Sequence, residues 1–408
     1  MEKQYNMKPL RYKKDAYIIV EGKQKADFFF IIQDGKVKIF KETMVKGEDD
    51  VLGPGDIFGV ISTMSSHSHI ETAQALTDVA LVPVHQHQYA EFIEKNTEVA
   101  IKIIMHFSKH LRHLNEALVK LTLKKTAINS LSHLYNVGEY YFNQNQYNQA
   151  LHAYTQYLKH CPEGGKTAAA RDRLEKLAGQ AVITEFNTND LNRTYSKNTM
   201  LFAEGEPGGE LFIIQKGSVG ITKIVDNKEM LLAMLNPGDI LGEMALLEGK
   251  LRTANAVAYD DCEVLAVNKA NFELLIKNQP QLIARITSLL ADRLWLMDEQ
   301  LGNAQIDNPI GRMYDALFIQ LEKSRVRPDG AAPYTFAFGL PELYKMVGLP
   351  EHEGEMLLPE MMKNKKIMII DGKIHTTSVE EIYKQSEFYR KMNREKAKKK
   401  IHSINHYA

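Results

Sequence analysis

Short runs that are either wholly apolar or alternate between hydrophobic and polar residues occur in two separate stretches of the chain. The runs cover residues 28–32 and 37–40 in the first stretch, and residues 211–214 and 219–224 in the second. Glycine-containing turns separate them, and short runs bounded by such turns are typical of β-strands with one buried face. Each stretch therefore predicts a small antiparallel β-roll of jelly-roll-like character.

A helical pattern follows each stretch, over residues 98–125 and 281–302, and neither range contains a proline. Apolar positions in both ranges alternate between spacings of three and four residues, which gives each helix a heptad-like seam. The seam positions are Ile104, Phe107, Leu111, Leu114, Leu118 and Leu121 in the first helix, and Ile283, Thr287, Leu290, Leu294, Met297 and Leu301 in the second. Each seam either packs on its own roll or pairs with another helix, so a homodimer and an intrachain pseudo-dimer both stay open.

The two stretches are copies of one another. Residues 30–35 match residues 212–217 except at Asp34 and Lys216, and residues 54–59 match residues 237–242 except at Phe58 and Leu241. Because the order and spacing of the matching segments are kept, we interpret the chain as an internal repeat of a β-roll followed by a long helix. The predicted fold class is mixed multidomain α+β.

In the second copy, residues 242–254 predict a turn, a short helix and a return into a strand. Gly242 permits close approach of the backbone, and the amides around Met244 and Ala245 at the start of a helix would donate to an anion. Arg252 could clamp phosphate oxygens. Glu243 would repel a phosphate, unless the ligand also presents a hydroxyl such as a ribose 2′-hydroxyl. Without such a ligand, Glu243 and Arg252 could equally form a surface ion pair.

These residues resemble the phosphate-binding cassette of the cyclic-nucleotide-binding family, which includes the catabolite activator and the regulatory subunits of cyclic-AMP-dependent kinase. The resemblance covers residues 8–125 and 191–302. It implies that Glu243 holds the ribose 2′-hydroxyl, Arg252 the cyclic phosphate, and the amides near Ala245 the remaining phosphate oxygen. It also implies that Thr253, with Met297 or Asp298, distinguishes adenine from guanine. The expected ligand is cyclic AMP or cyclic GMP, with cyclic AMP favoured by its prevalence in the family, and no separate cofactor is expected.

The first copy departs from this pattern. Val60 occupies the place of Glu243, and an alignment with two extra loop residues puts Glu71, Thr72 and Ala73 where Arg252, Thr253 and Ala254 stand. A carboxylate in place of the arginine predicts that this copy rejects the nucleotide, so one nucleotide should bind per chain. Several histidines stand nearby, and we interpret them as polar surface and predict no metal site; they are His67, His69, His85 and His87.

Residues 126–180 resemble a single tetratricopeptide repeat followed by one more helix at residues 166–178. The matching positions are Leu134, Val137, Gly138, Tyr141, Tyr147, Ala150, Tyr154 and Pro162. Such repeats need neighbours for stability, so an isolated one must lean on another part of the chain. We predict a structural spacer and not a peptide-binding groove.

Residues 308–380 resemble the winged helix-turn-helix domain of the catabolite activator family, with a wing hairpin around Asp371 and Gly372. The segment that would read DNA, residues 350–360, contains no lysine or arginine, and Pro359 is unfavourable inside a helix. It carries four carboxylates, those of Glu351, Glu353, Glu355 and Glu360. Because DNA recognition depends on cations at phosphates and donors at base edges, sequence-specific DNA binding is predicted to be unlikely. The basic residues of 381–408 are interpreted as a solvated tail.

Composition changes this picture little. The chain of 408 residues has a formal net charge of zero, 44% hydrophobic and 25% charged residues, and two cysteines far apart. We expect a multidomain cytoplasmic protein with no membrane span, no catalytic residues and no metal. The predicted function is a cyclic-nucleotide receptor that couples binding to a domain rearrangement and to regulation of a protein partner. The alternatives are a nucleotide-dependent transcription regulator and an enzyme's regulatory subunit, although no arginine-arginine inhibitor sequence supports the latter.

Overall fold

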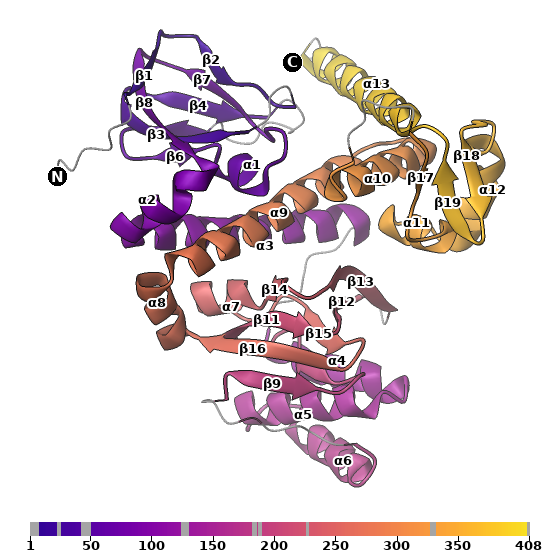
Figure 1. Ribbon diagram of the computed structural model, residues 1–408. Helices are drawn as coiled ribbons and strands as arrows, with labels where there is room; N and C mark the ends of the chain where they lie inside the picture. The colour runs from indigo at the N-terminus through magenta and orange to yellow at the C-terminus, as the bar shows by residue number, and fades with distance from the viewer. Residues whose placement is uncertain are drawn as a thin grey trace. The chain divides into compact units, whose positions relative to one another are not determined.

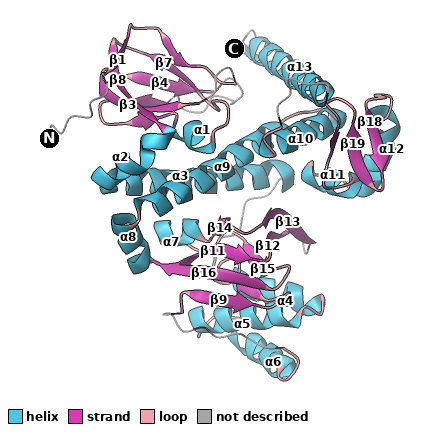
Figure 2. Cartoon of the chain, viewed as in Figure 1, coloured by secondary structure: helices cyan, strands magenta, loops and turns pink. Residues whose placement is uncertain are grey.

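A computed structural model describes residues 8–22, 26–41, 50–123, 130–181, 186, 190–225, 228–326 and 332–405. The chain divides into two compact units (Figures 1 and 2). The first unit comprises residues 1–86, 117–125 and 292–408, and the second comprises residues 87–116 and 126–291. Each unit thus combines segments from both sequence copies. Antiparallel rolls together with many helices confirm the mixed α+β multidomain fold class.

The first roll consists of two four-stranded antiparallel sheets, in the strand orders β1-β8-β3-β6 and β2-β7-β4-β5. Their inward faces enclose a core that includes Phe30, Ile32, Val37 and Leu81. A short helix, α1, lies in the connection between β6 and β7. The bounds are β1 Leu10–Tyr12, β2 Tyr17–Ile19, β3 Phe28–Asp34, β4 Val37–Phe40, β5 Asp50–Leu52, β6 Ile57–Phe58, α1 Val60–Ser65, β7 Thr72–Ala75 and β8 Val79–His85.

The second roll repeats this topology, with the orders β14-β11-β16-β9 and β10-β15-β12-β13. Its core includes Phe202, Phe212, Val219 and Val264. The helix α7 occupies the position that α1 has in the first roll. The bounds are β9 Asn192–Tyr195, β10 Met200–Phe202, β11 Glu210–Lys216, β12 Val219–Val225, β13 Lys228–Leu235, β14 Ile240–Leu241, α7 Glu243–Glu248, β15 Asn255–Ala258 and β16 Cys262–Asn268.

Helices follow each roll as the sequence predicts. They are the 3-10 helix η1 Gln86–Gln88, α2 Tyr89–Lys95 and α3 Thr97–Leu123 after the first roll, and α8 Lys269–Asn278 and α9 Pro280–Ala304 after the second. All six predicted seam positions of α9 are buried. In α3 the seam is buried only as far as Leu114, and Leu121 is 47% exposed. The prediction of a full seam is therefore wrong for the end of α3, because the periodicity continues past the part of the helix that is covered.

Three helices fill the segment between the copies: α4 His133–Asn143, α5 Tyr147–His160 and α6 Thr167–Leu177. Tyr141, Tyr154 and Tyr157 are almost completely buried between them. The same hydrophobic cluster includes Met200, Ala203 and Val257 of the second roll. The helical segment thus leans on that roll, as expected for an isolated helical repeat, whereas its assignment as a tetratricopeptide repeat stays a prediction.

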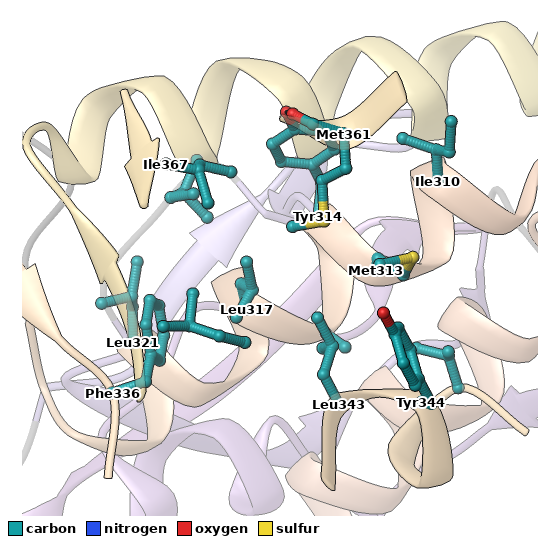
Figure 3. Packing of buried hydrophobic residues seen from close by; sticks show 14 of the residues in the cluster. Ile310, Met313, Tyr314, Leu317, Leu321, Phe336, Leu343, Tyr344, Met361 and Ile367 are labelled. Atoms are coloured by element: carbon teal, nitrogen blue, oxygen red, sulfur yellow. The ribbon is translucent and has the colours of Figure 1, made fainter. Parts of the chain in front are cut away.

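In the residues that the structure describes, the C-terminal part contains four helices and a three-stranded sheet with the order β17-β19-β18. Figure 3 shows its core, in which side chains of α10 such as Met313 and Leu317 lie close to Leu343 and Tyr344 of α11. The predicted hairpin is present, and Asp371 and Gly372 form its turn with positive φ angles. The bounds are α10 Pro309–Lys323, β17 Tyr334–Thr335, α11 Leu340–Met346, α12 Glu351–Met361, β18 Ile367–Ile370, β19 Lys373–Thr376 and α13 Val379–Asn405.

Two features of this part differ from the sequence interpretation. Helix α12 continues through Pro359, which lies in its last turn and does not end it. The basic segment from residue 381 is helical along its described length, and the part of α13 that packs on α10 is not a solvated tail. Arg390 forms ion pairs with Asp315 and Glu299, and Ser386 donates to Asp315 at 2.7 Å. In the sequence, Arg390 looks like any other residue of a basic run. Its carboxylate partners are distant along the chain, so the sequence alone does not predict that it is buried and paired.

Candidate functional site

A tight turn in the second roll begins the predicted cassette. Strand β14 ends at Leu241, Gly242 adopts φ 81° and ψ 0°, and α7 follows directly. A Cβ atom at position 242 would lie 2.4 Å from Nη1 of Arg252, so no side chain fits there. Glycine is therefore required twice at this position, for its left-handed backbone and for the room that it leaves to the guanidinium group.

Arg252 lies beside this turn and is only 5% exposed. Its Nη1 donates to the carbonyl of Gly242 at 2.6 Å, and its Nη2 donates to the carbonyl of Glu210 at 2.7 Å. The guanidinium carbon lies 4.2 Å from the ring centroid of Phe202. Nε is buried and has no hydrogen-bond partner within the described residues. A buried cation with an unused donor is suited to receive an anion.

Burial lowers the pKa of Arg252 from its ordinary value, and the carboxylates of Glu206, Glu243 and Glu210 act in the opposite direction. Each of the two terminal nitrogens donates to a backbone carbonyl, and no carboxylate forms a direct ion pair with the guanidinium group among the described residues. The buried positive charge of Arg252 is thus stabilised by the dipoles of two backbone carbonyls and by three carboxylates that do not contact it directly. An anionic ligand would supply the missing direct partner.

The remaining cassette residues surround the turn. Glu243 is 1% exposed and begins α7, while Met244 and Ala245 are buried in its first turn. Thr253 is partly buried, and its carbonyl accepts from Nζ of Lys223 at 2.9 Å. Because Glu243 and Arg252 are both buried, their interpretation as a surface ion pair is wrong.

Met297 and Asp298 belong to the first compact unit, whereas the cassette belongs to the second. Met297 is buried, and the carboxylate of Asp298 forms an ion pair with Lys41 from the end of β4. The structure thus gives Asp298 another partner, and a role of either residue at the base stays a prediction.

Strand pairing corrects the alignment of the first copy. Val37, Lys38 and Ile39 pair with Ala75, Gln74 and Ala73, as Val219, Gly220 and Ile221 pair with Ala258, Val257 and Ala256. The amide of Gly22 donates to the carbonyl of His69 at 2.8 Å, as that of Gly205 donates to the carbonyl of Arg252 at 2.9 Å. His69 is therefore the counterpart of Arg252. The prediction that Glu71 takes this place, after two extra residues, is wrong because the loop contains no insertion.

The corrected register still removes both polar anchors from the first copy. Val60 begins α1 where Glu243 begins α7, and burial lowers the pKa of His69 to about 4, which leaves its imidazole neutral near pH 7. Glu71, two positions further on, accepts a hydrogen bond from the amide of Gly59 at 3.0 Å. A carboxylate of this chain thus occupies the amide at the start of the short helix, and no cation replaces Arg252.

The far end of the second cassette is held by a helix from the first copy. Nε of Arg112 in α3 donates to both carboxylate oxygens of Glu248, at 3.0 and 3.2 Å, and the hydroxyl of Ser108 donates to the same group at 3.3 Å. The side chains of Arg112 and Glu248 are 4% and 3% exposed. In the second unit, a buried ion pair therefore links α7 directly to α3. No sequence pattern predicts this pair, because its partners lie far apart along the chain.

The interpretation of the first-copy histidines as polar surface is wrong for His67 and His69, which are 7% and 4% exposed, whereas His87 is exposed. His67 stacks on Trp295 of α9 with ring centroids 3.7 Å apart, and His85 meets Phe28 edge-on. Within the described ranges, no group of three or more His, Cys, Asp or Glu side chains could hold a metal ion. None of the described helices is long and apolar enough to cross a membrane.

Comparisons with known proteins agree with the two rolls. The cyclic nucleotide-binding domain profile matches residues 9–96 and 192–279. The cAMP-activated global transcriptional regulator CRP of Salmonella typhimurium is 36% identical over 141 residues, which span 33% of this chain and 67% of that protein. The Pasteurella multocida protein of the same name is 30% identical over 182 residues, 44% of this chain and 85% of that protein.

Among solved structures, the catabolite activator protein of Thermus thermophilus aligns with 48% of this chain and 90% of its own length, at 25% identity and a TM-score of 0.27. The profile matches and the sequence relatives point to one family. The chain belongs to the cyclic nucleotide-binding domain family, as a two-roll relative of the catabolite activator proteins.

Proposed function

We propose that the chain is a cyclic-nucleotide receptor that binds one cyclic mononucleotide, cyclic AMP or cyclic GMP, in its second roll. The observation that carries the proposal is the buried guanidinium group of Arg252, whose Nε has no partner among the described residues. In this proposal Arg252 holds the cyclic phosphate, the amides of Met244 and Ala245 assist it, and Glu243 accepts from the ribose 2′-hydroxyl. The chain acts by binding and not by catalysis.

Binding would be transmitted through the cassette helix. A ligand that contacts the start of α7 can shift this six-residue helix, and the Arg112–Glu248 pair connects its other end to α3. Because the pair is buried and Nε of Arg112 is shared between both carboxylate oxygens of Glu248, α3 would follow the movement of α7 rather than lose the contact. A rearrangement of this kind would change the surface presented to a protein partner.

Calorimetric titration of the full chain with cyclic AMP, and separately with cyclic GMP, tests the proposal. We expect one site per chain for at least one of the two nucleotides. Arg252→Ala should weaken binding while the protein stays folded, as judged by its unfolding midpoint. Absence of binding to both nucleotides would refute the receptor function, and two equal sites would refute the assignment to the second roll alone.

The second candidate is a nucleotide-dependent transcription regulator. The relatives named as transcriptional regulators favour it, since one of them matches this chain over 85% of its own length. The chemistry of α12 argues against sequence-specific DNA binding by this chain. Its four carboxylates are all exposed, and its only exposed basic side chain is that of His352.

Selection from random DNA duplexes, with and without cyclic AMP, separates the two candidates. A receptor that acts on a protein partner enriches no sequence under either condition. Enrichment of a consensus that requires cyclic AMP, and that is lost when residues 351–361 are replaced, would establish the transcription regulator instead.

A further inference from the structure

The backbone of Arg252 is held by a turn that precedes β11. The amide of Arg252 donates to the carbonyl of Glu206 at 2.8 Å, and the amide of Gly205 donates to the carbonyl of Arg252 at 2.9 Å. Both backbone groups of the arginine therefore depend on residues 205 and 206. A displacement of this turn would shift the backbone of Arg252 relative to the carbonyls of Gly242 and Glu210 that hold its guanidinium group, and would change how that group is oriented.

The helical segment α4–α6 holds this turn in place. The carboxylate of Glu206 lies 2.9 Å from Nε2 of His152 in α5, and it also accepts from the amide of Ala203 at 2.9 Å. Gly205 has φ 87°, and a Cβ there would lie 2.9 Å from the carbonyl oxygen of Ser130, just before α4. The helical segment thus approaches the turn closely enough to exclude a side chain.

A second connection leads from α4 to Thr253. His133 Nε2 lies 3.4 Å from Oε2 of Glu204 without a hydrogen bond between them, so this link is electrostatic, and Oε1 of the same carboxylate accepts from Nζ of Lys223 at 2.6 Å. The same Nζ donates to the carbonyl of Thr253 at 2.9 Å. Glu204 is 1% exposed, so the connection is buried along its length. The two connections end on the two neighbouring cassette residues, Arg252 and Thr253.

In the first connection, from His152 through Glu206 to Arg252, the charges favour the position of Arg252. Burial opposes ionisation of Glu206, but the charge and hydrogen bond of His152, the Ala203 amide and the charge of Arg252 outweigh it and lower the pKa of that carboxyl. An ionised Glu206 stabilises the positive charge of Arg252 without occupying the donors that a ligand would use. Its hydrogen bonds go to His152 and Ala203 instead.

Apolar packing docks the helices independently of these polar connections. Tyr154 and Leu134 share one hydrophobic cluster with Met200, Ala203 and Val257 of the second roll. Burial of this cluster favours the docked state, and the loss of the part-buried His152–Glu206 hydrogen bond leaves this apolar contribution in place. The polar connections are therefore not needed merely to attach the helices.

We propose that α4 and α5 form a positioning platform for the nucleotide site, in which His152 acts through Glu206 on Arg252, and His133 acts through Glu204 and Lys223 on Thr253. The inference rests on the proposed binding of a cyclic nucleotide in the second roll. His152 and His133 are positioning residues that do not touch the ligand. The helical segment then sets nucleotide affinity in addition to separating the two rolls.

The test compares variants of the full chain by cyclic AMP titration and by thermal unfolding. His152→Ala should weaken affinity about tenfold, the effect of losing one charge-assisted hydrogen bond that orients the arginine. His152→Gln should restore affinity to within about twofold of the unsubstituted protein, because the glutamine amide can donate to Glu206 in the same way. His133→Ala provides a second, independent loss along the other connection.

Arg173→Ala is the matched control. Arg173 in α6 forms hydrogen bonds to Glu139 of α4 at 2.8 and 3.0 Å and makes no described contact with the turn. It should lower the unfolding midpoint and leave affinity unchanged. If His152→Ala and His133→Ala keep full affinity while Arg252→Ala loses it, the platform is refuted and the receptor function stands. If the unsubstituted protein binds neither cyclic AMP nor cyclic GMP, both are refuted.

Discussion

In the first roll Gly59 adopts φ 77° before Val60, and in the second roll Gly242 adopts φ 81° before Glu243. The short helix that follows has six residues in both rolls. In an earlier turn of each roll, the amide of Gly22 donates to the carbonyl of His69, as that of Gly205 donates to the carbonyl of Arg252. The backbone of the cassette is thus preserved in both copies. Turn glycines and strand pairing maintain it, and the ligand-facing side chains are not required for it.

The chemistry inside the two cassettes is opposite. The second contains a buried arginine whose Nε has no hydrogen-bond partner among the described residues, whereas the first contains a neutral histidine and a carboxylate that accepts from the amide of Gly59. In the first unit Lys41 also forms an ion pair with Asp298. One copy is therefore prepared for an anion, and the other satisfies its polar groups internally.

A matched pair of substitutions provides the strongest test of this difference. Arg252→Ala removes a charge-assisted phosphate contact of roughly 1.5 to 3 kcal/mol, which weakens nucleotide affinity about tenfold to a hundredfold. His69→Ala, at the equivalent position of the first roll, should leave affinity within about twofold. Calorimetric titration measures both, and equal losses would mean that the first roll also contributes to binding.

The same titration counts the sites. With Val60 and His69 in place of Glu243 and Arg252, the first roll offers no carboxylate at the ribose position and no cation for phosphate. We expect a stoichiometry of one nucleotide per chain. Two sites of similar affinity would contradict the comparison between the rolls.

The sequence predicted the repeat, the rolls, the long helices and the residues of the second cassette, because turn motifs and periodicity are local signals. It did not predict which residue of the first copy corresponds to Arg252. A threonine and an alanine follow both Glu71 and Arg252, which makes a shifted alignment attractive. Only the hydrogen-bonded register with β4 fixes the correct one. The partners of Asp298, Glu206 and Arg390 were missed for a similar reason, since each contact joins residues distant in sequence.

Acid should destabilise the first roll through His69. Its pKa is about 4 in the folded state and about 6.5 in an unfolded chain. The contribution of the neutral imidazole is fully present above pH 6.5 and is lost as pH falls toward 4. Between pH 7 and pH 5 this amounts to about 2 kcal/mol of unfolding free energy. Urea unfolding at the two pH values should show the loss, and His69→Gln, which cannot titrate, should abolish this part of it.

The second roll provides the control for this pH dependence. Arg252 stays charged throughout this pH range. Arg252→Gln should therefore leave the difference in unfolding free energy between pH 7 and pH 5 nearly unchanged. If Arg252→Gln reduces the difference as much as His69→Gln does, the acid sensitivity does not originate at the substituted histidine.

A smaller effect, of opposite sign, is expected at Glu71. Burial raises the pKa of this carboxyl, together with the charges of Asp298 and Asp50, although the Gly59 amide and Lys41 act the other way. The protonated carboxyl of Glu71 contributes stability that is fully present below the ordinary glutamate pKa. This contribution is lost as the pH rises through the raised pKa of Glu71 in the folded state. Glu71→Gln keeps an acceptor for Gly59 and should raise the unfolding free energy at neutral pH by on the order of 1 kcal/mol. A destabilised variant would show that the ionised carboxylate is usefully paired with Lys41.

The smallest effect is expected at Asp298, where sequence resemblance and structure give different partners. The resemblance implies a contact with the base, but the carboxylate forms an ion pair with Lys41 in the first unit, and both side chains are mostly buried. Removing the charge should therefore act on the first unit, because a buried Lys41 loses its partner. Asp298→Asn should lower the unfolding free energy and keep the affinities for cyclic AMP and cyclic GMP within about twofold.

Thr253→Ala offers the contrast, since Thr253 follows Arg252 directly and is only partly buried. Loss of one hydrogen bond from its hydroxyl should change the ratio of the two affinities about threefold to tenfold. Titration of both variants with both nucleotides measures the ratio of the cyclic AMP and cyclic GMP affinities. A larger change in this ratio for Asp298→Asn than for Thr253→Ala would place Asp298 at the base. It would also mean that Asp298 exchanges its pairing with Lys41 for the base when the ligand binds.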